Sequence, residues 1–405
     1  MSRRKISVAV TFPIWPPRGG GQSRIFHLYR HLAKTCPVDV ICITNANDLP
    51  SDREIAPGLR EVRVPKSRAH RMAELELSRA VPGVPISDVA MPRLIHLTPD
   101  YRRALETSVA DAGIAIASHP YLFPLLRELT GGPIWYEAHN VETMLKRMML
   151  PDTPAARELL VETEQVERAC CAASERLIVC AAADGLAFQQ DFDVPEARII
   201  EIPNGVDLDT AEYVGPEARL AAKGRLGLGE TVTVLFMGSR HKPNCDALEA
   251  ILRFAPSCPD IRFLILGSVC GHAEERPIPF NLGLMGEVDD VVKVTTLGLV
   301  DGALNPMASG SGTNLKMLDY FAAGVPVIST RHGARGLAVV DGVHLQLSGI
   351  DEFPTALRRL QAEIGGPELA GRVAASRRLV QAHYDWARLA ERFGESIDRT
   401  ARSRA

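Results

Sequence analysis

Residues 300–330 read VDGALNPMASGSGTNLKMLDYFAAGVPVIST, and this stretch decides how the chain is interpreted. The apolar run 300–304 is closed by Asn305 and Pro306, which is typical of the end of a strand. Residues 308–313 have almost no side-chain bulk, so a ligand can approach the backbone closely. The stretch therefore predicts a strand that leads into a small-residue loop.

A helix is predicted to follow this loop. Thr313 is a suitable N-cap, and apolar residues then recur at helical spacing until Gly324 and Pro326 end the helix. Residues 325–329 predict the next buried strand. The free N–H groups and positive dipole end at the start of the helix favour an anion, most naturally a phosphate.

Asp319 makes a nucleotide the natural ligand of this segment. It lies six residues after Thr313, roughly 9 Å along a helix axis. That distance suits the reach from a diphosphate to the ribose of the same nucleotide, whose hydroxyls a carboxylate can accept. The spacing alone leaves open an amphipathic helix with a solvated Asp319 after a glycine-rich turn.

Three short runs in this region carry a family resemblance: GSGTNLK at 310–316, LD at 318–319 and GVPV at 324–327. They resemble the donor-binding motif of the retaining family-four glycosyltransferases of GT-B fold. Those enzymes often carry two Glu separated by seven residues, and here the two positions hold Ser311 and Asp319. The small-residue form resembles a subgroup without the first Glu, which indicates a variant rather than an inactive enzyme. The resemblance implies donor contacts at Ser311, Gly312, Thr313, Asn314, Leu315 and Asp319.

Length and composition fit a two-domain protein. The chain has 405 residues, 46% of them apolar and 23% charged, with a net charge of −3, so no basic field indicates nucleic acid. Its eight cysteines show no zinc-type spacing and are expected to be reduced core thiols. We therefore expect no bound metal and no cofactor, because the nucleotide-sugar would be a co-substrate.

The amino-terminal half alternates strands and helices in the manner of an open α/β sheet. Strands are predicted at 6–12 and 38–43, with a helix opened by Ser23 between them. The triple glycine 19–21 follows the first strand and matches neither a dinucleotide fingerprint nor a P-loop. It reads as a simple turn or, by the resemblance, as a loop in which Gly20 and Gly21 lie against the donor diphosphate and the acceptor.

Two histidines follow the predicted strands 114–118 and 134–137. Carboxyl ends of parallel strands share one sheet edge, so His119 and His139 are expected at the same site. A histidine at a strand end is often only a satisfied structural residue. The resemblance favours His119 as a contact of the transferred sugar, with His139 beside it or facing the acceptor.

In the carboxyl-terminal half, the predicted strand 232–237 is followed by Gly238, Arg240 and Lys242. Exposed cations are usually solvated, but the resemblance implies that Arg240 and Lys242 clamp the donor diphosphate and stabilise its departure. The run 284–288 resembles the segment that edges the base, which implies donor contacts at Gly286 and Val288.

The location of the protein is predicted from three features. The start leads directly into a strand and leaves no room for a signal peptide, and no run of 18 apolar residues suggests a membrane span. A basic bias within 45–105 is either a solvated face or a contact with anionic lipid or an acidic acceptor. A cytoplasmic protein is expected, with peripheral contact at the inner face of the membrane left open.

The fold class is therefore predicted to be α/β GT-B, with two Rossmann-like domains facing across a cleft. We expect an acceptor-side domain at 1–203, a donor-binding domain at 204–384, and a last helix at 385–405 returning to the first domain. The predicted activity is metal-independent, retaining transfer of a sugar from a nucleotide-sugar to an acceptor hydroxyl in polysaccharide or glycoconjugate synthesis. The acceptor could be a glycan, a lipid-linked molecule or a small molecule. A nucleotide-sugar epimerase and an inactive nucleotide-sugar-binding homologue are the alternatives.

Overall fold

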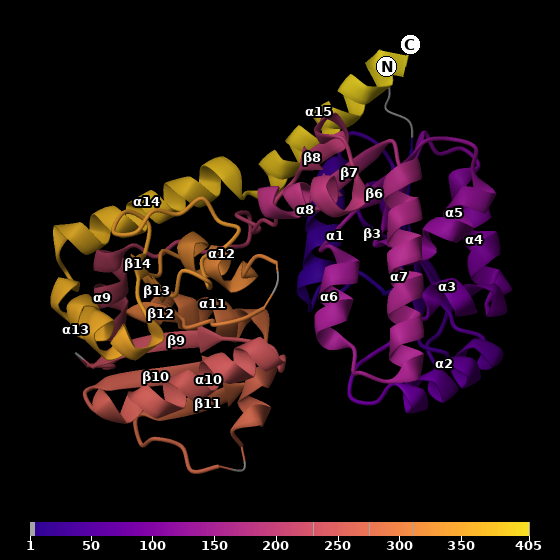
Figure 1. Ribbon diagram of the computed structural model, residues 1–405. Coiled ribbons are helices and arrows are strands. Elements are labelled where there is room, and N and C mark those ends of the chain that lie inside the picture. The colour runs from indigo at the N-terminus through magenta and orange to yellow at the C-terminus, as the bar shows by residue number, and fades with distance from the viewer. Residues whose placement is uncertain (1–4, 230, 275, 311, 405) are drawn as a thin grey trace. The chain divides into compact units, whose positions relative to one another are not determined.

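The computed structural model describes residues 5–229, 231–274, 276–310 and 312–404 (Figure 1). The chain divides into two compact units, which we call the N-terminal and the C-terminal unit. The N-terminal unit is Met1–Pro203 with Leu389–Ala405, and the C-terminal unit is Asn204–Arg388. Each unit has its own sheet, which is mostly parallel in the first and fully parallel in the second, and the predicted α/β class is confirmed.

The N-terminal unit contains an eight-stranded sheet in the order β3-β4-β2-β1-β5-β6-β7-β8. Neighbouring strands are parallel throughout, except that β3 runs antiparallel to β4. The strands are β1 (Ile6–Val10), β2 (Val38–Thr44), β3 (Ser51–Ala56), β4 (Leu59–Pro65), β5 (Ile114–Ser118), β6 (Ile134–Glu137), β7 (Arg176–Val179) and β8 (Ile199–Glu201).

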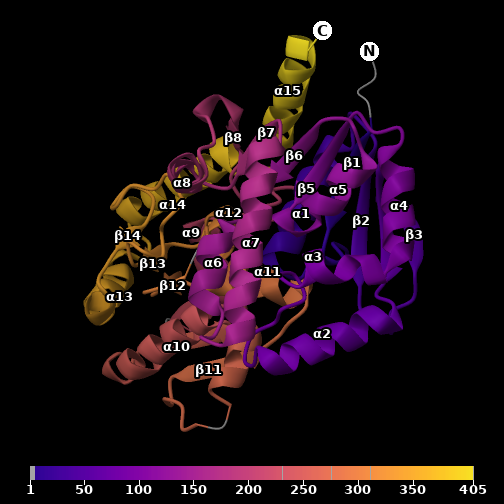
Figure 2. The ribbon, with the colours of Figure 1, turned by 45° about the vertical axis from the view of Figure 1, so that its right-hand side comes forward.

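Helices cover both faces of this sheet. Successive strand residues point to opposite sides, and apolar residues on both sides are buried. Ala9, Ala117 and Tyr136 belong to the core beneath α4, α5 and α7, whereas Trp135 on the other face contacts Phe393 of α15. In both ribbon views α6 and α7 lie side by side (Figures 1 and 2). The helices are α1 (Gly20–Leu32), α2 (Arg68–Ala80), α3 (Met91–Leu94), α4 (Pro99–Val109), α5 (Phe123–Leu129), α6 (Glu142–Met149), α7 (Pro154–Ala173), α8 (Ala182–Phe192) and α15 (Trp386–Arg404).

The C-terminal unit contains a six-stranded, fully parallel sheet in the order β11-β10-β9-β12-β13-β14. One face packs against α10 and α13 and the other against α11, α12 and α14. The strands are β9 (Val232–Met237), β10 (Ile261–Leu266), β11 (Leu282–Gly286), β12 (Gly302–Asn305), β13 (Val327–Ser329) and β14 (Gln346–Leu347). The helices are α9 (Pro216–Arg225), α10 (Lys242–Phe254), α11 (Asp290–Leu299), α12 (Leu315–Ala322), α13 (Phe353–Glu363) and α14 (Pro367–His383).

The structure corrects the predicted start of α1. The helix begins at Gly20 and not at Ser23. Its N-cap is Gly19, whose backbone N–H is capped by the side chain of Gln22. Gln22 Oε1 accepts hydrogen bonds from the Gly19 and Arg18 N–H groups at 2.9 and 3.0 Å. Gly20 and Gly21 therefore lie in the first helical turn and not in a free loop.

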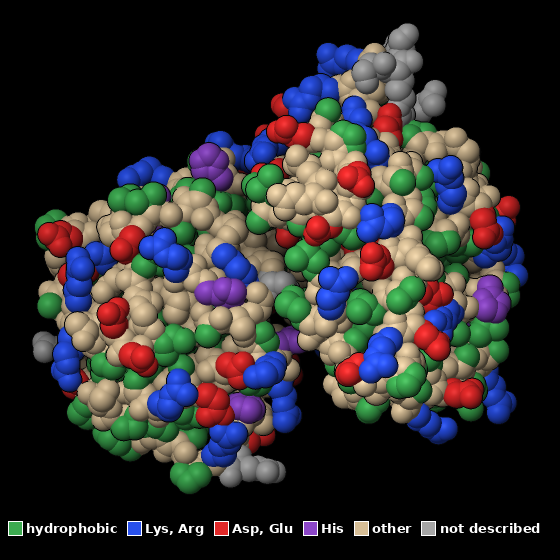
Figure 3. Space-filling model, in the orientation of Figure 1, with side chains coloured by type: hydrophobic (Ala, Val, Ile, Leu, Met, Phe, Trp, Pro, Cys, Tyr) green, Lys and Arg blue, Asp and Glu red, His purple; other side chains and the backbone are tan. Residues whose placement is uncertain are grey.

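Three further observations bear on the composition and the surface. All eight cysteines have free thiols, and seven of them are buried. None of the helices in the described chain combines the length and the apolar character needed to span a membrane. On the face of each unit that Figure 3 shows, basic and acidic side chains are interspersed, which fits the small net charge.

Candidate functional site

Residues at the carboxyl ends of β9, β10 and β11 form the floor of the candidate donor site in the C-terminal unit. The Gly238 N–H, just after β9, donates to the Leu266 carbonyl oxygen at 2.9 Å. The Gly267 N–H, just after β10, donates to the Gly286 carbonyl oxygen at 2.7 Å. A Cβ on Gly267 would lie 2.3 Å from the Gly238 carbonyl oxygen, so only glycine allows this approach. Gly238 and Gly286 are thus brought to one sheet edge.

The small-residue loop leads from β12 into α12 at the same edge. The helix begins at Leu315, so its N-cap is Asn314 and not Thr313 as predicted. Thr313 Oγ1 is buried and has no hydrogen-bond partner among the described residues; it faces Gly336, where a Cβ would lie 2.7 Å from it. The Met237 N–H donates to Tyr320 Oη at 2.9 Å and fixes α12 to the end of β9. Ser311 lies outside the described residues.

Asp319 has a partner that the sequence did not suggest. Lys293 of α11 donates from Nζ to Asp319 Oδ2 at 2.9 Å, and both side chains are about one-third exposed. The negative charge of Asp319 raises the pKa of Lys293 above its usual value. The ribose contact of Asp319 stays a prediction, because a carboxylate can accept further hydrogen bonds beside one lysine.

The two predicted clamp cations have different surroundings. The Arg240 N–H donates to Ser268 Oγ at 3.0 Å, and its side chain extends towards Gly271, where a Cβ would lie 3.5 Å from Nη1. Lys242 is not at a strand exit, as predicted, but is the first residue of α10. Its Nζ donates to both oxygens of Asp246 at 2.9 Å, and the side chain is 84% exposed. The charge of Lys242 is therefore already partly balanced.

Two further cations border the small-residue loop, and the sequence analysis did not single them out as site residues. Lys316 donates from Nζ to Asn244 Oδ1 at 2.7 Å. Arg335 approaches the loop so closely that a Cβ on Gly310 would lie 3.3 Å from Nη2. One signal could have found Lys316: a cation in the first turn of a helix opposes the helix dipole, which is unfavourable unless an anion is present. No spacing rule indicates Arg335.

An apolar cluster supports the remaining predicted donor contacts. Val288 and Leu315 are half-buried and pack against a buried apolar cluster whose members include Leu266 and Leu318. Gly286 has a φ of +70°, a backbone conformation that favours glycine, and it turns the chain from β11 towards Val288. The base contacts of Gly286 and Val288 stay a prediction.

The N-terminal unit brings its two predicted histidines together. His119 follows β5 and His139 follows β6, and their ring centroids are 4.2 Å apart. His139 Nε2 lies 3.1 Å from Ser118 Oγ. Burial, with the nearby charges of His119 and Arg24, lowers the pKa of His139 well below its usual value, so this ring is neutral near pH 7. The two imidazoles form one cluster at the sheet edge.

His119 is held in a strained backbone conformation. Its φ of 70° and ψ of 156° lie in a region that only glycine adopts readily, and such strain gathers at functional sites. Its Nδ1 is buried, and no residue in the described part of the chain forms a hydrogen bond with it. Its Nε2 lies 3.9 Å from Glu142 Oε1, and Tyr121 Oη donates to the other Glu142 oxygen at 2.6 Å. Glu142 was not predicted as a site residue.

Gly21 is placed beside this histidine cluster. A Cβ there would lie 3.2 Å from Phe12 Cζ and 3.5 Å from His139 Nδ1. A larger residue would have to displace one of these rings. Gly21 therefore keeps the space between α1 and the exit of β6 open, while the predicted donor and acceptor contacts of Gly20 and Gly21 stay predictions.

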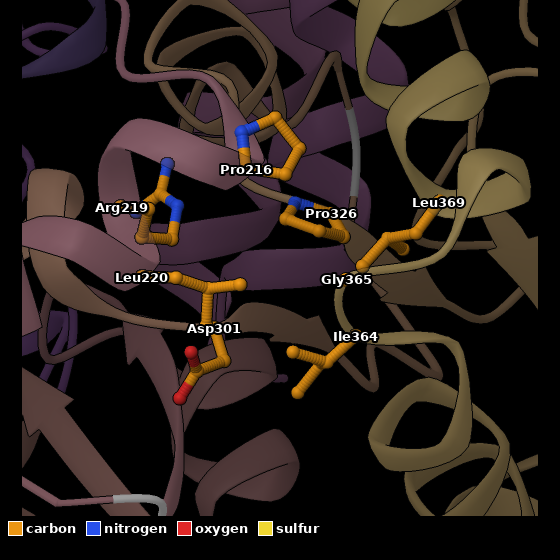
Figure 4. Close-up of a pocket in the computed structure, with 8 residues that line it drawn as sticks. All are labelled: Pro216, Arg219, Leu220, Asp301, Pro326, Ile364, Gly365 and Leu369. Carbon is orange, nitrogen blue, oxygen red and sulfur yellow. The ribbon is translucent and has the colours of Figure 1, made fainter.

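A small pocket elsewhere in the C-terminal unit has a structural explanation. Its lining includes Asp301 and Pro326, which precede β12 and β13, so it lies at the amino ends of the strands (Figure 4). Arg219 beside it donates to carbonyl oxygens, including that of Val300 at 2.8 Å and that of Gly324 at 3.0 Å. Burial lowers the pKa of Arg219 to about 10. Arg219 thus satisfies backbone carbonyl groups at the sheet edge opposite the candidate donor site.

Comparisons with known proteins relate both halves of the chain to glycosyltransferase families. Residues 18–210 match the family described as Glycosyltransferase Family 4, and residues 231–363 match the family described as Glycosyl transferases group 1. A phosphatidyl-myo-inositol mannosyltransferase of Mycobacterium tuberculosis is 26% identical over 57% of this chain and 62% of its own length. The match thus spans less than two-thirds of that relative.

Solved structures show the same fold. A sucrose-phosphate synthase from Thermosynechococcus elongatus superposes with a TM-score of 0.76 at 17% identity, covering 99% of this chain and 100% of its own. Anabaena HepE in complex with UDP-glucose superposes with a TM-score of 0.66 at 12% identity, covering 98% and 100%. Residues 18–210 and 231–363 are thus similar to two glycosyltransferase families, and the chain has the GT-B fold.

Proposed function

We propose that this protein transfers a sugar from a nucleotide-sugar donor to an acceptor hydroxyl, with retention of configuration and without a metal ion. One observation carries the proposal: Gly238, Gly286 and the small-residue loop before α12 lie at one sheet edge of the C-terminal unit. The carboxyl edge of a parallel sheet is where ligands of such folds bind. The two family matches agree with this assignment.

The donor nucleotide would be held along this edge. The backbone N–H groups of 312–315 face a diphosphate, and Asp319 accepts the ribose hydroxyls. Gly286 and Val288 border the base. We also assign Ser311 to the donor on the strength of the motif alone.

The chemistry would rest on the leaving group and not on a covalent nucleophile. Arg240 and Lys242 stabilise the charge that grows on the departing diphosphate. His119 contacts the transferred sugar, with His139 beside it. The acceptor oxygen attacks the face that the leaving group vacates, and the diphosphate takes the proton of the acceptor hydroxyl.

The donor and acceptor are to be sought among the compounds that related proteins suggest. HepE was solved with UDP-glucose, and the mycobacterial relative is named for a phosphatidyl-inositol acceptor. A thermal-shift screen of UDP-, GDP-, ADP- and dTDP-sugars comes first. Ligand at about 100 times its dissociation constant adds roughly 2.7 kcal/mol of apparent stability.

Release of the nucleotide then separates the candidate functions. A transferase releases nucleoside diphosphate only when an acceptor is present, and an epimerase converts the donor without an acceptor. An inactive homologue binds the donor and does neither. Acceptor-independent conversion, or binding without turnover over a panel of inositol, glycan and lipid acceptors, would refute the proposed transferase.

We further propose a cytoplasmic protein whose helix α2 contacts anionic lipid. Met72 and Leu75 are 58% and 44% exposed, although both are large apolar residues. The exposed side chains Arg68, Arg71 and Arg79 share this helix. Sedimentation with phosphatidylglycerol vesicles should be lost in Met72→Gln/Leu75→Gln, whereas equal binding of the variant or equal binding to phosphatidylcholine vesicles would refute the contact.

A further inference from the structure

Lys316 differs from the other lysines of the C-terminal unit in its partners. Its Nζ donates to the neutral oxygen Asn244 Oδ1 at 2.7 Å, lies 4.3 Å from the centroid of the Phe236 ring, and is 3.9 Å from Met307 Sδ. Lys223, Lys242 and Lys293 instead pair with the carboxylates of Asp301, Asp246 and Asp319. Among the described residues, no carboxylate lies within ion-pair distance of Lys316 Nζ.

The position of this amine indicates what its missing partner is. Lys316 is the second residue of α12, so its side chain points back towards the helix start. Asn244, which accepts its hydrogen bond, also donates from Nδ2 to the Ser239 carbonyl oxygen at 3.0 Å, just after β9. The amine therefore lies between the exit of β9 and the small-residue loop. An anion at the start of α12 would be within reach of it.

The surroundings of Lys316 oppose a positive charge on its side chain. Burial and the positive charge of Arg335 lower the pKa of Lys316 to about 7. The helix dipole acts in the same direction, because its positive end lies at the first turn of α12. The other charged or titratable groups on the neighbouring elements include Arg240, His241, the Lys242–Asp246 pair, Cys245, Glu249, the Asp319–Lys293 pair, Tyr320, Arg331 and His332. At pH 8 the side chain is thus mostly a neutral amine.

We propose that Lys316 is a further donor-binding residue, which takes up a proton from solvent when a nucleoside diphosphate binds and then contacts the diphosphate as an ammonium. This inference rests on the proposed function, since it needs the diphosphate at the start of α12. The step is balanced: one solvent proton converts the amine to the ammonium, and no covalent bond to the ligand forms. The bound anion supplies the counter-charge that the described residues do not.

Isothermal titration calorimetry tests the proton uptake. UDP, GDP and ADP are titrated into the full chain at pH 8, in buffers that differ in ionisation enthalpy. The slope of the observed enthalpy against the buffer ionisation enthalpy gives the protons taken up per bound nucleotide. We expect uptake of most of one proton at pH 8, because the free amine is mostly neutral there and the free diphosphate has already lost its last proton.

Three variants make the experiment specific. Lys316→Arg keeps a permanent cation, so binding should persist while the proton uptake disappears. Lys316→Met should bind nucleotide about tenfold to a hundredfold more weakly at pH 6.5. Lys293→Arg keeps the ion pair with Asp319 and is the matched control, with unchanged proton uptake.

The outcomes separate this inference from the proposed function. Binding by the wild-type chain without proton uptake, or unchanged uptake in Lys316→Arg, would overturn the inference and leave the donor site intact. If the wild-type chain binds none of the three nucleotides and no other nucleoside diphosphate, the proposed donor site itself is refuted. If Lys316→Met does not fold, Lys316→Arg still decides the question.

Discussion

Lys293 Nζ donates to Asp319 Oδ2 at 2.9 Å, and this ion pair joins α11 to α12 in the C-terminal unit. The pair orients the carboxylate on the helix that follows the small-residue loop. Asp319 is one methylene shorter than the Glu usual at this motif position, so its reach is smaller. The ion pair already holds the Asp319 side chain in one position, so less side-chain entropy is lost when the ribose binds. This smaller entropy loss offsets part of the affinity that the shorter reach would cost.

The first prediction concerns Asp319→Asn, which keeps the shape of the side chain and removes its charge. Hydrogen bonds to charged groups contribute about 1.5–3 kcal/mol, so nucleotide affinity should fall roughly tenfold to a hundredfold. The 2′-deoxyribose analogue already lacks part of the contact and should lose less. Calorimetric titration of both nucleotides measures the difference.

Two controls accompany this substitution. Lys293→Met removes the partner and keeps the carboxylate, so it should cost less affinity than Asp319→Asn. Ser311→Ala should be mild. Equal losses for the ribose and deoxyribose nucleotides would place Asp319 away from the ribose, and the helix would then bind phosphate alone.

Much of the framework could be predicted because buried parallel strands appear as continuous apolar runs. β5, β6 and β9 were predicted to the residue, and with them the positions of His119 and His139 at neighbouring strand ends. The proximity of these two rings is confirmed. The pair β3–β4 and helices α2, α3 and α4 were not predicted. In β3 the reason is that the strand is largely exposed and lacks an apolar run.

Side-chain partners were harder to predict than elements. Lys242 was predicted to lie at a strand exit, but it is the first residue of α10. Pro243 could have indicated this, because proline suits the first turn of a helix. The Lys293–Asp319 pair joins residues that are 26 positions apart, and no local pattern indicates it. Lys316 stands inside the recognised motif, yet its burial follows from Phe236, Asn244 and Met307, which come from three other segments.

The second prediction uses the backbone strain at His119. His119→Ala and His119→Gly both remove the imidazole, so both should lower turnover strongly if this ring contacts the transferred sugar. The Ala variant keeps a Cβ at a φ of 70°, a conformation that costs about 1–3 kcal/mol for a residue other than glycine. Chemical denaturation should therefore find the Gly variant more stable than the Ala variant. Equal stability would mean that the strain is relieved in solution, and normal turnover would refute the sugar contact.

The third prediction concerns pH and His70, whose Nδ1 lies 2.9 Å from Thr98 Oγ1. Burial, followed by the charge of Lys66, lowers the pKa of His70 from 6.5 to about 4. Between these two values the unfolded chain binds the proton and the folded chain does not, so stability falls as the pH falls through this window. The melting temperature should drop from pH 7 to pH 5, and the drop should be smaller in His70→Gln. His383→Gln, at an exposed position, is the control, and an equal drop in all three proteins would contradict the assignment.

The fourth prediction is that catalysis needs no divalent metal ion. Arg240, Lys316 and Arg335 lie around the exit of β9 and the small-residue loop, where they can supply the positive charge that a metal would otherwise bring to the diphosphate. Turnover after exhaustive chelation with EDTA should equal turnover before it. A large loss that magnesium or manganese restores would overturn the claim.

The last prediction separates the two cations of the proposed clamp. Charge on the leaving diphosphate grows towards the transition state, so removing a clamp donor should lower turnover more than nucleotide affinity. Losing one such donor typically costs about 10²–10³ in rate, and we expect this for Arg240→Ala.

Lys242→Ala should cost less than Arg240→Ala, because Asp246 already accepts two hydrogen bonds from Lys242 Nζ and the pair is open to solvent. Asp246→Asn is the matched variant: it removes the balancing charge and should leave turnover equal or higher if Lys242 faces the leaving group. Steady-state kinetics with separate values of kcat and KM measure all three. Near-normal kcat in Arg240→Ala and Lys242→Ala would refute the clamp, and the charge of the departing diphosphate would then fall to Lys316 and Arg335.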